Sequence, residues 1–282
     1  EYFANVKPSF VPFRDAICGE CTYPCTILDC LRGLKYAIEL GWYNPKTFNS
    51  KEYEEYEKVD NGDMNWIIPG KFLAFSSPSN TPYDFEGYKT FTPGDYAPLF
   101  KKWNINLVVR LNKPVYDKEK FIKNKIKHID LYFLDGSTPS EAIIDTFLSV
   151  AEKEKGALAV HCKAGLGRTG TLIGLYAMKH FKFPVAAFIG YIRICRPGSI
   201  LGPQQQFLCQ EEAKYFKKGE VYRQKNGLND ELCLKLDKMR LSDNNTNSNK
   251  NKKVLSKKDK DILKYGDKGQ GEGLVDSKKK KK

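Results

Sequence analysis

The ten residues 161–170 read His-Cys-Lys-Ala-Gly-Leu-Gly-Arg-Thr-Gly and constrain this chain more than any other stretch, because they combine a thiol, a glycine-rich turn and a fixed cation. The apolar run 157–160 just before them is typical of a buried strand. Apolar residues then recur at helical spacing over 169–181. The stretch is therefore predicted to be a loop that joins a strand to a helix.

This loop is suited to bind a phosphate dianion. The first N–H groups of a helix have no intrahelical acceptor and carry partial positive charge. Glycines allow the backbone to curl so that several N–H groups point inward, and an arginine can contact two phosphoryl oxygens at once. We predict that the phosphate is bound by Lys163, Ala164, Gly165, Leu166, Gly167 and Arg168. The same positive surroundings should hold Cys162 as a thiolate, the nucleophilic form, near neutral pH.

A second motif overlaps the first, since 165–170 also fits G-x-G-x-x-G between a strand and a helix. That dinucleotide-binding pattern requires an acidic residue about 20 positions further on, to bind a ribose hydroxyl. Residues 181–210 contain no Asp or Glu. The dinucleotide interpretation is therefore rejected.

Asp135 is the predicted general acid. Transfer of a phosphoryl group from serine to a thiol requires protonation of the departing oxygen. Asp135 follows a predicted strand, so it should share a sheet edge with Cys162, and Gly136 would let its loop move; a plain Asp-Gly turn is the alternative. In the second step Asp135 would take a proton from water. Arg168 would stabilise charge in both steps, and Thr169 would hydrogen-bond the sulfur as it leaves.

Two other groups of polar residues near the loop have two interpretations each. His161 either orients the loop through backbone contacts or is an ordinary core histidine. Gln204, Gln205 and Gln206 follow Gly202-Pro203 at a predicted helix start. An amide there could position the hydrolytic water, or the three side chains could be exposed without a role.

The cysteines indicate a reducing setting rather than a metal centre. The chain has 8 cysteines, and its best motif needs a free thiolate. Cys18, Cys21, Cys25 and Cys30 supply one C-x-x-C followed by cysteines inside a helical pattern, which favours buried thiols over zinc. We predict no metal and no cofactor. No run of apolar residues is long enough for a membrane span.

Predicted strands and helices alternate from residue 61 onward. Strands are expected at 66–68, 71–75, 107–111, 128–133 and 157–160, and helices at 93–103, 117–125, 138–154, 169–181, 184–195 and 203–221. The helix at 138–154 should begin with a capping box at Thr138 and with Pro139 in its first position. The alternation predicts an α/β fold with a largely parallel central sheet flanked by helices.

The remaining segments suggest three further units around a catalytic domain at 61–227. Residues 1–46 contain one amphipathic helix, 26–40, with too few partners to form a domain, so it should belong to a larger unit that the chain lacks. Residues 47–60 form an acidic linker helix, capped by Asn49. Glu54 and Glu57 share one face of it, which is either solvated or an acidic surface for a basic substrate segment.

Residues 228–282 are predicted to be a disordered basic tail. The chain has a net charge of +13, and residues 241–282 hold 13 lysines against 6 acidic residues. With so few apolar residues this stretch cannot bury enough surface to fold. It could serve nuclear import, contact nucleic acid, anionic membrane or acidic partners, or simply be solvated.

Further motifs carry a resemblance to a known family. His-Cys, five residues, Arg and Thr is the pattern of the cysteine-dependent protein phosphatases. Over residues 11 to about 225 the chain strongly resembles the mitotic-exit dual-specificity phosphatases of the cell-division-cycle-fourteen family. The matching blocks are 21–23, 61–69, 135–139, 161–169, 193–199 and 202–207.

This resemblance implies a cysteine-phosphatase fold preceded by the remnant of a second, inactive phosphatase-like domain. It implies hydrolysis of phosphoserine, phosphothreonine and phosphotyrosine in substrates of proline-directed kinases. Phosphoserine-proline sites with a downstream basic residue would be preferred, opposing cyclin-dependent kinases at cell-cycle exit. Glu54, Glu57 and Asp63 fall where the family's acidic groove lies, and Ala164 would face the substrate proline. The implied location is the nucleus and cytoplasm, including the nucleolus, spindle or centrosome-like structures.

Two other functions remain as alternatives. Lipid phosphatases of the phosphatase-and-tensin type have a similar loop with a second lysine, where this chain has Leu166, which weakens the case for an inositol phosphate substrate. A phosphoprotein-binding scaffold would be favoured by loss of the nucleophile, the cation or the acid. Cys162, Arg168 and Asp135 are all present.

Overall fold

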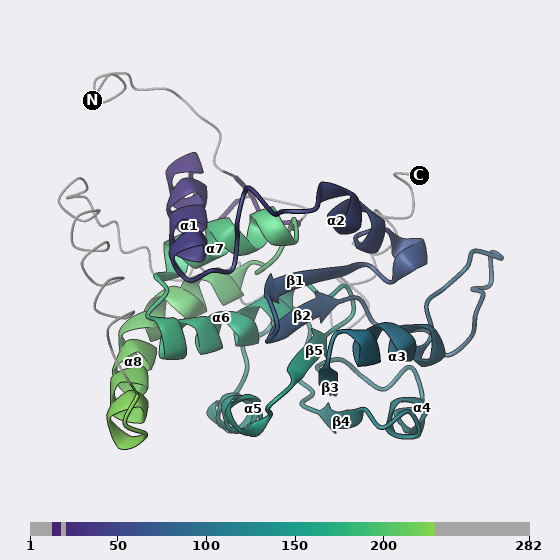
Figure 1. Ribbon diagram of the computed structural model, residues 1–282. Coiled ribbons are helices and arrows are strands. Elements are labelled where there is room, and N and C mark those ends of the chain that lie inside the picture. The colour runs from purple at the N-terminus through teal and green to yellow at the C-terminus, as the bar shows by residue number, and fades with distance from the viewer. Residues whose placement is uncertain (1–12, 18–20, 229–282) are drawn as a thin grey trace.

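The computed structural model describes residues 13–17 and 21–228 of the chain (Figure 1). Its strands are β1 (Met64–Ile68), β2 (Phe72–Phe75), β3 (Ile105–Arg110), β4 (Lys127–Asp130) and β5 (Ala157–His161). Its helices are α1 (Ile27–Glu39), α2 (Ser50–Tyr56), α3 (Pro93–Lys102), α4 (Glu119–Ile122), α5 (Glu141–Lys153), α6 (Gly167–Phe181), α7 (Val185–Cys195) and α8 (Pro203–Lys225), with a 3-10 turn η1 (Val59–Asn61).

The five strands form one sheet in the order β1-β2-β5-β3-β4. β1 runs antiparallel to β2, and β2, β5, β3 and β4 are parallel to one another. The predicted largely parallel sheet is therefore confirmed. β5 lies in the middle, so the loop that follows it emerges at the centre of the carboxyl edge, where ligands bind in folds of this kind.

Helices cover both faces of the sheet, and alternate strand residues divide between them. Phe72 and Ala74 of β2 join the core beneath α1, α5, α6, α7 and α8, whereas Leu73 and Phe75 join the core beneath α3 and α4. Figure 1 shows these two sets of helices on opposite sides of the strands. The two-residue period of a strand explains the division, and burial on both faces explains why the strands are almost wholly apolar.

The helix at the amino-terminal end of the described chain packs tightly against this domain. Thr26 caps α1 with a capping box, and α1 packs against α7 at two glycines. A Cβ atom on Gly33 would lie 2.3 Å from the carbonyl oxygen of Ala187, and one on Gly190 would lie 2.6 Å from the carbonyl carbon of Asp29. The two backbones therefore touch. The opposite side of α1 exposes Ile27, Leu28, Leu31 and Ile38.

Several predicted boundaries are wrong. α4 (Glu119–Ile122) is shorter than the predicted 117–125, α8 continues to Lys225 rather than to about 221, and β4 (Lys127–Asp130) ends before the predicted 133. α2 ends at Tyr56 rather than near residue 60, because Asn61 Nδ2 donates to the carbonyl oxygen of Glu55 at 2.9 Å and ends the helix. α5 is capped by Ser140, which accepts from Ile143 N, and not by Thr138. The chain just before it is held in a turn, since Ser137 N donates to Leu134 O.

Several predictions fall outside the described residues. Residues 1–12, 18–20 and 229–282 are not described, so the predicted tail and Cys18 lie outside, as does much of the predicted amino-terminal remnant. The division into four units stays a prediction. Within 13–17 and 21–228, none of the helices combines the length and the apolar character that crossing a membrane requires.

Candidate active site

The loop after β5 turns its carbonyl groups outward, and each carbonyl oxygen from residue 162 to residue 166 accepts a hydrogen bond. The donors, in order, are His161 Nδ1 at 3.0 Å, Ser77 N at 2.9 Å, Arg196 Nη2 at 2.8 Å, Arg196 Nε at 2.8 Å and Gly170 N at 3.0 Å. In a trans peptide the N–H points opposite to the C=O. The N–H groups of residues 163–167 are thereby directed to the other side, where they can surround an anion.

Glycine is required at two positions of this loop. Gly165 has φ +66°, and a Cβ there would lie 2.0 Å from the carbonyl oxygen of Phe75. A Cβ on Gly167, the first residue of α6, would lie 2.7 Å from Gln204 Oε1. The loop is therefore wedged between β2 and α8, with no room for larger residues.

Arg168 and Asp135, two of the three residues predicted to carry out the chemistry, contact each other beside the loop that begins at Cys162. Cys162 is 3% exposed, and Arg168 is fully buried in the first turn of α6. Arg168 Nε lies 3.3 Å from Asp135 Oδ1. Arg168 Nη1 donates to the carbonyl oxygens of Phe133 at 3.0 Å and Leu111 at 3.3 Å, so the guanidinium is fixed by the segments that follow β4 and β3.

Asp135 lies in a turn and contacts Arg168, and its role as the general acid stays a prediction. Ser137 N donates to Leu134 O, and Gly136 has φ +74°. Gln204 Nε2 donates to the carbonyl oxygen of Ser137 at 2.9 Å, which ties this turn to α8. Thr169 is buried beneath the loop, and its hydroxyl has no hydrogen-bond partner among the described residues.

His161 combines its two proposed roles. It is fully buried, and its Nδ1 lies 3.0 Å from the carbonyl oxygen of Cys162. Burial lowers the pKa of His161 to about 3, so the imidazole is neutral. It is a core histidine that also contacts the backbone of Cys162, the predicted nucleophile.

Arg196 is the site residue that the sequence reasoning overlooked. It caps the end of α7, is 1% exposed, and holds the carbonyl oxygens of Ala164 and Gly165. Its Nη1 also donates to Asp63 Oδ1 at 3.0 Å and to Asn65 Oδ1 at 2.7 Å. The block at 193–199 was the only sequence signal for it, and that block did not reveal these partners.

The pairing with Arg196 corrects the place assigned to Asp63. The resemblance implied an acidic groove that included Asp63, yet this side chain is 3% exposed and paired with the arginine. Glu54 and Glu57, in contrast, are exposed on α2 and at its carboxyl end. Only these two carboxylates of the three are on the surface.

The glutamines after Gly202 are not exposed. Gln204 and Gln205 are buried, and Gln205 Nε2 donates to Asp15 Oδ2 at 3.0 Å, whereas Gln206 Nε2 donates to Thr22 O at 2.9 Å. Of the three glutamines, Gln204 alone borders both the predicted phosphate loop (residues 162–168) and the turn that contains Asp135. Ala164 is buried, in a small apolar cluster with Leu166 and Leu201.

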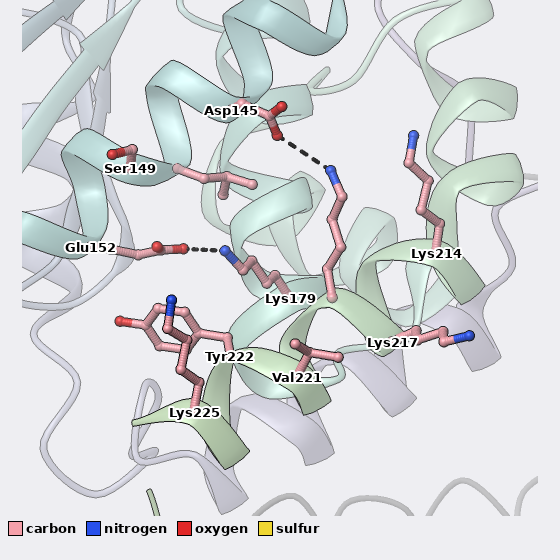
Figure 2. Close-up of a pocket in the computed structure, with 11 residues that line it drawn as sticks. Asp145, Ser149, Glu152, Lys179, Lys214, Lys217, Val221, Tyr222 and Lys225 are labelled. Carbon is pink, nitrogen blue, oxygen red and sulfur yellow. Dashed lines mark hydrogen bonds and ion pairs between the residues drawn. The ribbon is translucent and has the colours of Figure 1, made fainter. Parts of the chain in front are cut away.

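A lysine-rich groove of about 750 Å³ lies between α5 and α8. Figure 2 shows Lys179, at the carboxyl end of α6, reaching Glu152 across it. Arg168 is in the first turn of α6, about 16 Å from Lys179 along the helix axis, and Cys162 precedes this helix. The groove is therefore separate from the candidate active site.

Comparison with known proteins gives two family matches and a group of relatives. Residues 1–37 match "Dual specificity protein phosphatase, N-terminal half", and residues 87–182 match "Polymorphic toxin system, DSP-PTPase phosphatase". Among solved structures, PTPMT1 is 18% identical and covers 56% of this chain and 99% of its own, with a TM-score of 0.46. That likeness is too low to locate residues.

The relatives are far more similar. Dual specificity protein phosphatase CDC14A of Mus musculus is 52% identical over 78% of this chain and 36% of its own length. CDC14B of the same species is 50% identical over 77% of this chain and 45% of its own. The chain thus spans less than half the length of these two relatives. With half of the aligned residues identical, the chain belongs to the family of CDC14 dual specificity phosphatases.

Proposed function

We propose that this protein hydrolyses phosphoserine, phosphothreonine and phosphotyrosine in proteins through a phosphocysteine intermediate. The observation that carries the proposal is the contact between Arg168 and Asp135 beside the loop that begins at Cys162, in which the carbonyl oxygens of residues 162–166 all accept hydrogen bonds. The names of the relatives, dual specificity protein phosphatases, support the same reaction class.

In the first step, Cys162 Sγ attacks phosphorus in line with the ester oxygen. The P–S bond forms as the P–O bond breaks, and the leaving oxygen takes the proton of Asp135. Arg168 and the loop N–H groups hold the equatorial oxygens, where charge gathers. In the second step water attacks phosphorus, Asp135 takes its proton, and the P–S bond breaks to release phosphate.

The Arg168–Asp135 contact suggests how the acid is freed. The guanidinium lies 3.3 Å from the carboxylate. A phosphoryl group that binds Arg168 competes for the same positive charge, since both are anions. Binding would therefore displace Asp135 from the arginine. The released carboxylate takes up a proton from solvent and turns towards the ester oxygen as the acid, and Gly136 supplies the backbone freedom for that movement.

We propose peptides with phosphoserine, proline and a downstream basic residue as substrates, in the setting of cell-cycle exit. The exposed carboxylates of Glu54 and Glu57 would attract the basic residue. Ala164 and Leu166 would present a small apolar surface beside the loop. Leu166 replaces the second lysine of lipid phosphatases, which favours protein over inositol phosphate substrates.

Substitution Asp135→Asn tests the reaction. We expect kcat on a phosphoserine peptide to fall about 10²- to 10³-fold, because a serine alkoxide must be protonated as it leaves. On p-nitrophenyl phosphate, whose leaving group needs no proton, the loss should stay below about tenfold. Steady-state kinetics on both substrates gives the comparison.

The matched control is Cys162→Ser, which should abolish turnover on both substrates while phosphopeptide binding persists. Equal losses with Asp135→Asn on the two substrates would reject Asp135 as the acid. Turnover by Cys162→Ser near the wild-type rate would reject the phosphocysteine route altogether.

A further inference from the structure

A tyrosine hydroxyl lies between two histidines behind the nucleophile. Tyr116, in the loop after β3, places its hydroxyl oxygen 2.8 Å from Nε2 of His128 on β4 and 2.8 Å from Nε2 of His161 at the end of β5. His161 in turn lies 3.0 Å, through Nδ1, from the carbonyl oxygen of Cys162. Two side chains, those of Tyr116 and His161, thus connect the half-buried His128 on the edge strand to the backbone of Cys162.

The chemistry of these groups allows only one direction of donation along this series of hydrogen bonds. A carbonyl oxygen only accepts, so His161 Nδ1 carries the proton. The imidazole is neutral, since burial lowers the pKa of His161 to about 3, and its Nε2 is therefore a bare acceptor. Tyr116 must then donate to His161. Its single proton is used there, so its oxygen accepts from His128 Nε2.

His128, at the other end of this series of hydrogen bonds, agrees with this assignment. Burial, reinforced by the positive charge of Arg110, lowers the pKa of His128 to about 4, so that His128 too is neutral. With the proton on Nε2, its Nδ1 carries none. His128 Nδ1 is a buried atom without a hydrogen-bond partner among the described residues, as expected for the unprotonated nitrogen.

Arg110 and Asp130 fix the tyrosine in this position. Arg110 Nη1 donates to the carbonyl oxygen of Tyr116 at 2.8 Å, and its guanidinium carbon lies 4.7 Å from the centre of the tyrosine ring. Asp130 accepts from Arg110 Nε at 2.6 Å. The tyrosine is held by its backbone and by its ring face, while its hydroxyl serves the histidines.

We propose that Tyr116 and His128 are positioning residues that fix the first peptide group of the phosphate loop through His161. The carbonyl oxygens of residues 163–166 accept hydrogen bonds from Ser77, Arg196 and Gly170. That of Cys162 accepts from His161, which Tyr116 and His128 hold in place. The inference rests on the proposed function. The peptide group that is held consists of the carbonyl of Cys162 and the N–H of Lys163, and it is bonded to the Cα atom that carries the cysteine side chain.

Substitution Tyr116→Phe removes the hydroxyl alone. We expect kcat on p-nitrophenyl phosphate to fall about tenfold with KM unchanged, the size expected for one lost hydrogen bond that orients reacting groups. Alkylation of Cys162 by iodoacetamide at pH 6.5 should slow by a similar factor. His128→Leu should lose about threefold in both, and His128→Gln, whose amide can still donate, should stay within about twofold of wild type.

Tyr191→Phe is the matched control, because Tyr191 is also buried and donates its hydroxyl to a backbone carbonyl, that of Ile67 at 2.8 Å. It should lower the thermal unfolding midpoint as Tyr116→Phe does, without changing kcat or alkylation. The double variant Tyr116→Phe with His128→Leu should lose no more than Tyr116→Phe alone, since the groups act in series.

The proposal is overturned if folded Tyr116→Phe keeps kcat and alkylation within twofold of wild type. It is equally overturned if Tyr191→Phe loses as much as Tyr116→Phe, or if His128→Gln loses as much as His128→Leu. If Tyr116→Phe does not fold, the comparison of His128→Gln with His128→Leu still tests the proposal. Alkylation needs no substrate, so it still tests the chain of hydrogen bonds if the wild-type protein fails to hydrolyse phosphopeptides, the outcome that would reject the proposed function.

Discussion

Arg196 illustrates how one buried charge organises the candidate site. Its guanidinium makes five hydrogen bonds, two to loop carbonyls and three to Asp63 and Asn65. A buried cation is stable only when it is paired and fully hydrogen-bonded. Asp63 is thus the counter-ion of the residue that shapes the phosphate loop, rather than a free surface charge.

Substitution Asp63→Asn should therefore act on stability. Asn tolerates the left-handed backbone that Asp63 adopts, with φ +48°, so the loss of charge is the main change. Because it leaves the buried Arg196 uncompensated, we expect the free energy of unfolding to fall by about 3 kcal/mol. Urea titration measures this. Unchanged stability together with a loss of preference for basic peptides would return Asp63 to the substrate groove.

The sequence predicted contacts between residues that are close in the chain, but it did not predict the contact between Asp63 and Arg196. Cys162 and Arg168 are six positions apart on one loop, so their meeting follows from the loop alone. Asp63 and Arg196 are 133 positions apart, and their contact depends on how β1 and α7 are placed in the folded chain. No local pattern contains that information.

Helices and strands were predictable where the apolar period was clear, and their ends were not. α3, α6 and α7 agree closely with their predicted bounds. α2 and α5 differ because Asn61 and Gln204 hold the neighbouring backbone through contacts that a period does not reveal. The close crossing of α1 and α7 was likewise not predicted, because glycine inside a helix usually indicates only a lower helix propensity.

Substitution Gly190→Ala tests this crossing. The added Cβ would lie 2.6 Å from the backbone of Asp29, so α1 must shift away from α7. We expect a loss of about 1–3 kcal/mol in the free energy of unfolding, the usual cost of overpacking. The control is Gly94→Ala in α3, where the nearest atom is at 3.5 Å, and which should be neutral or slightly stabilising. Equal effects in urea titration would contradict the close approach.

At the scale of the whole molecule, charge is unevenly placed. The chain carries a net charge of +13, yet it exposes carboxylates at Glu54 on α2 and at Glu57, the residue that caps this helix. Such a local reversal of sign can select a basic segment even when the protein as a whole repels it. The lysine-rich groove lies at the distant end of α6.

The double substitution Glu54→Lys, Glu57→Lys should change substrate ranking. We expect kcat/KM to fall roughly fivefold for a phosphoserine-proline peptide with a downstream lysine, because exposed ion pairs contribute up to about 1 kcal/mol. The same peptide with alanine there should be unaffected. Glu220→Lys, a half-exposed residue of α8, is the control for added positive charge. An unchanged ranking of the two peptides would reject the acidic surface.

The outward-facing carbonyls of the phosphate loop also have a consequence for the order of folding. They are held by Ser77 after β2, by Arg196 at the end of α7 and by His161 within β5. A nascent α6 can form its own hydrogen bonds early, but β5 needs β2 and β3 as partners. The anion-binding shape also requires Ser77 and Arg196, which come from distant parts of the chain. Recovery of phosphate binding on refolding would accordingly follow the slowest of these arrivals, which makes it a late marker of the native state.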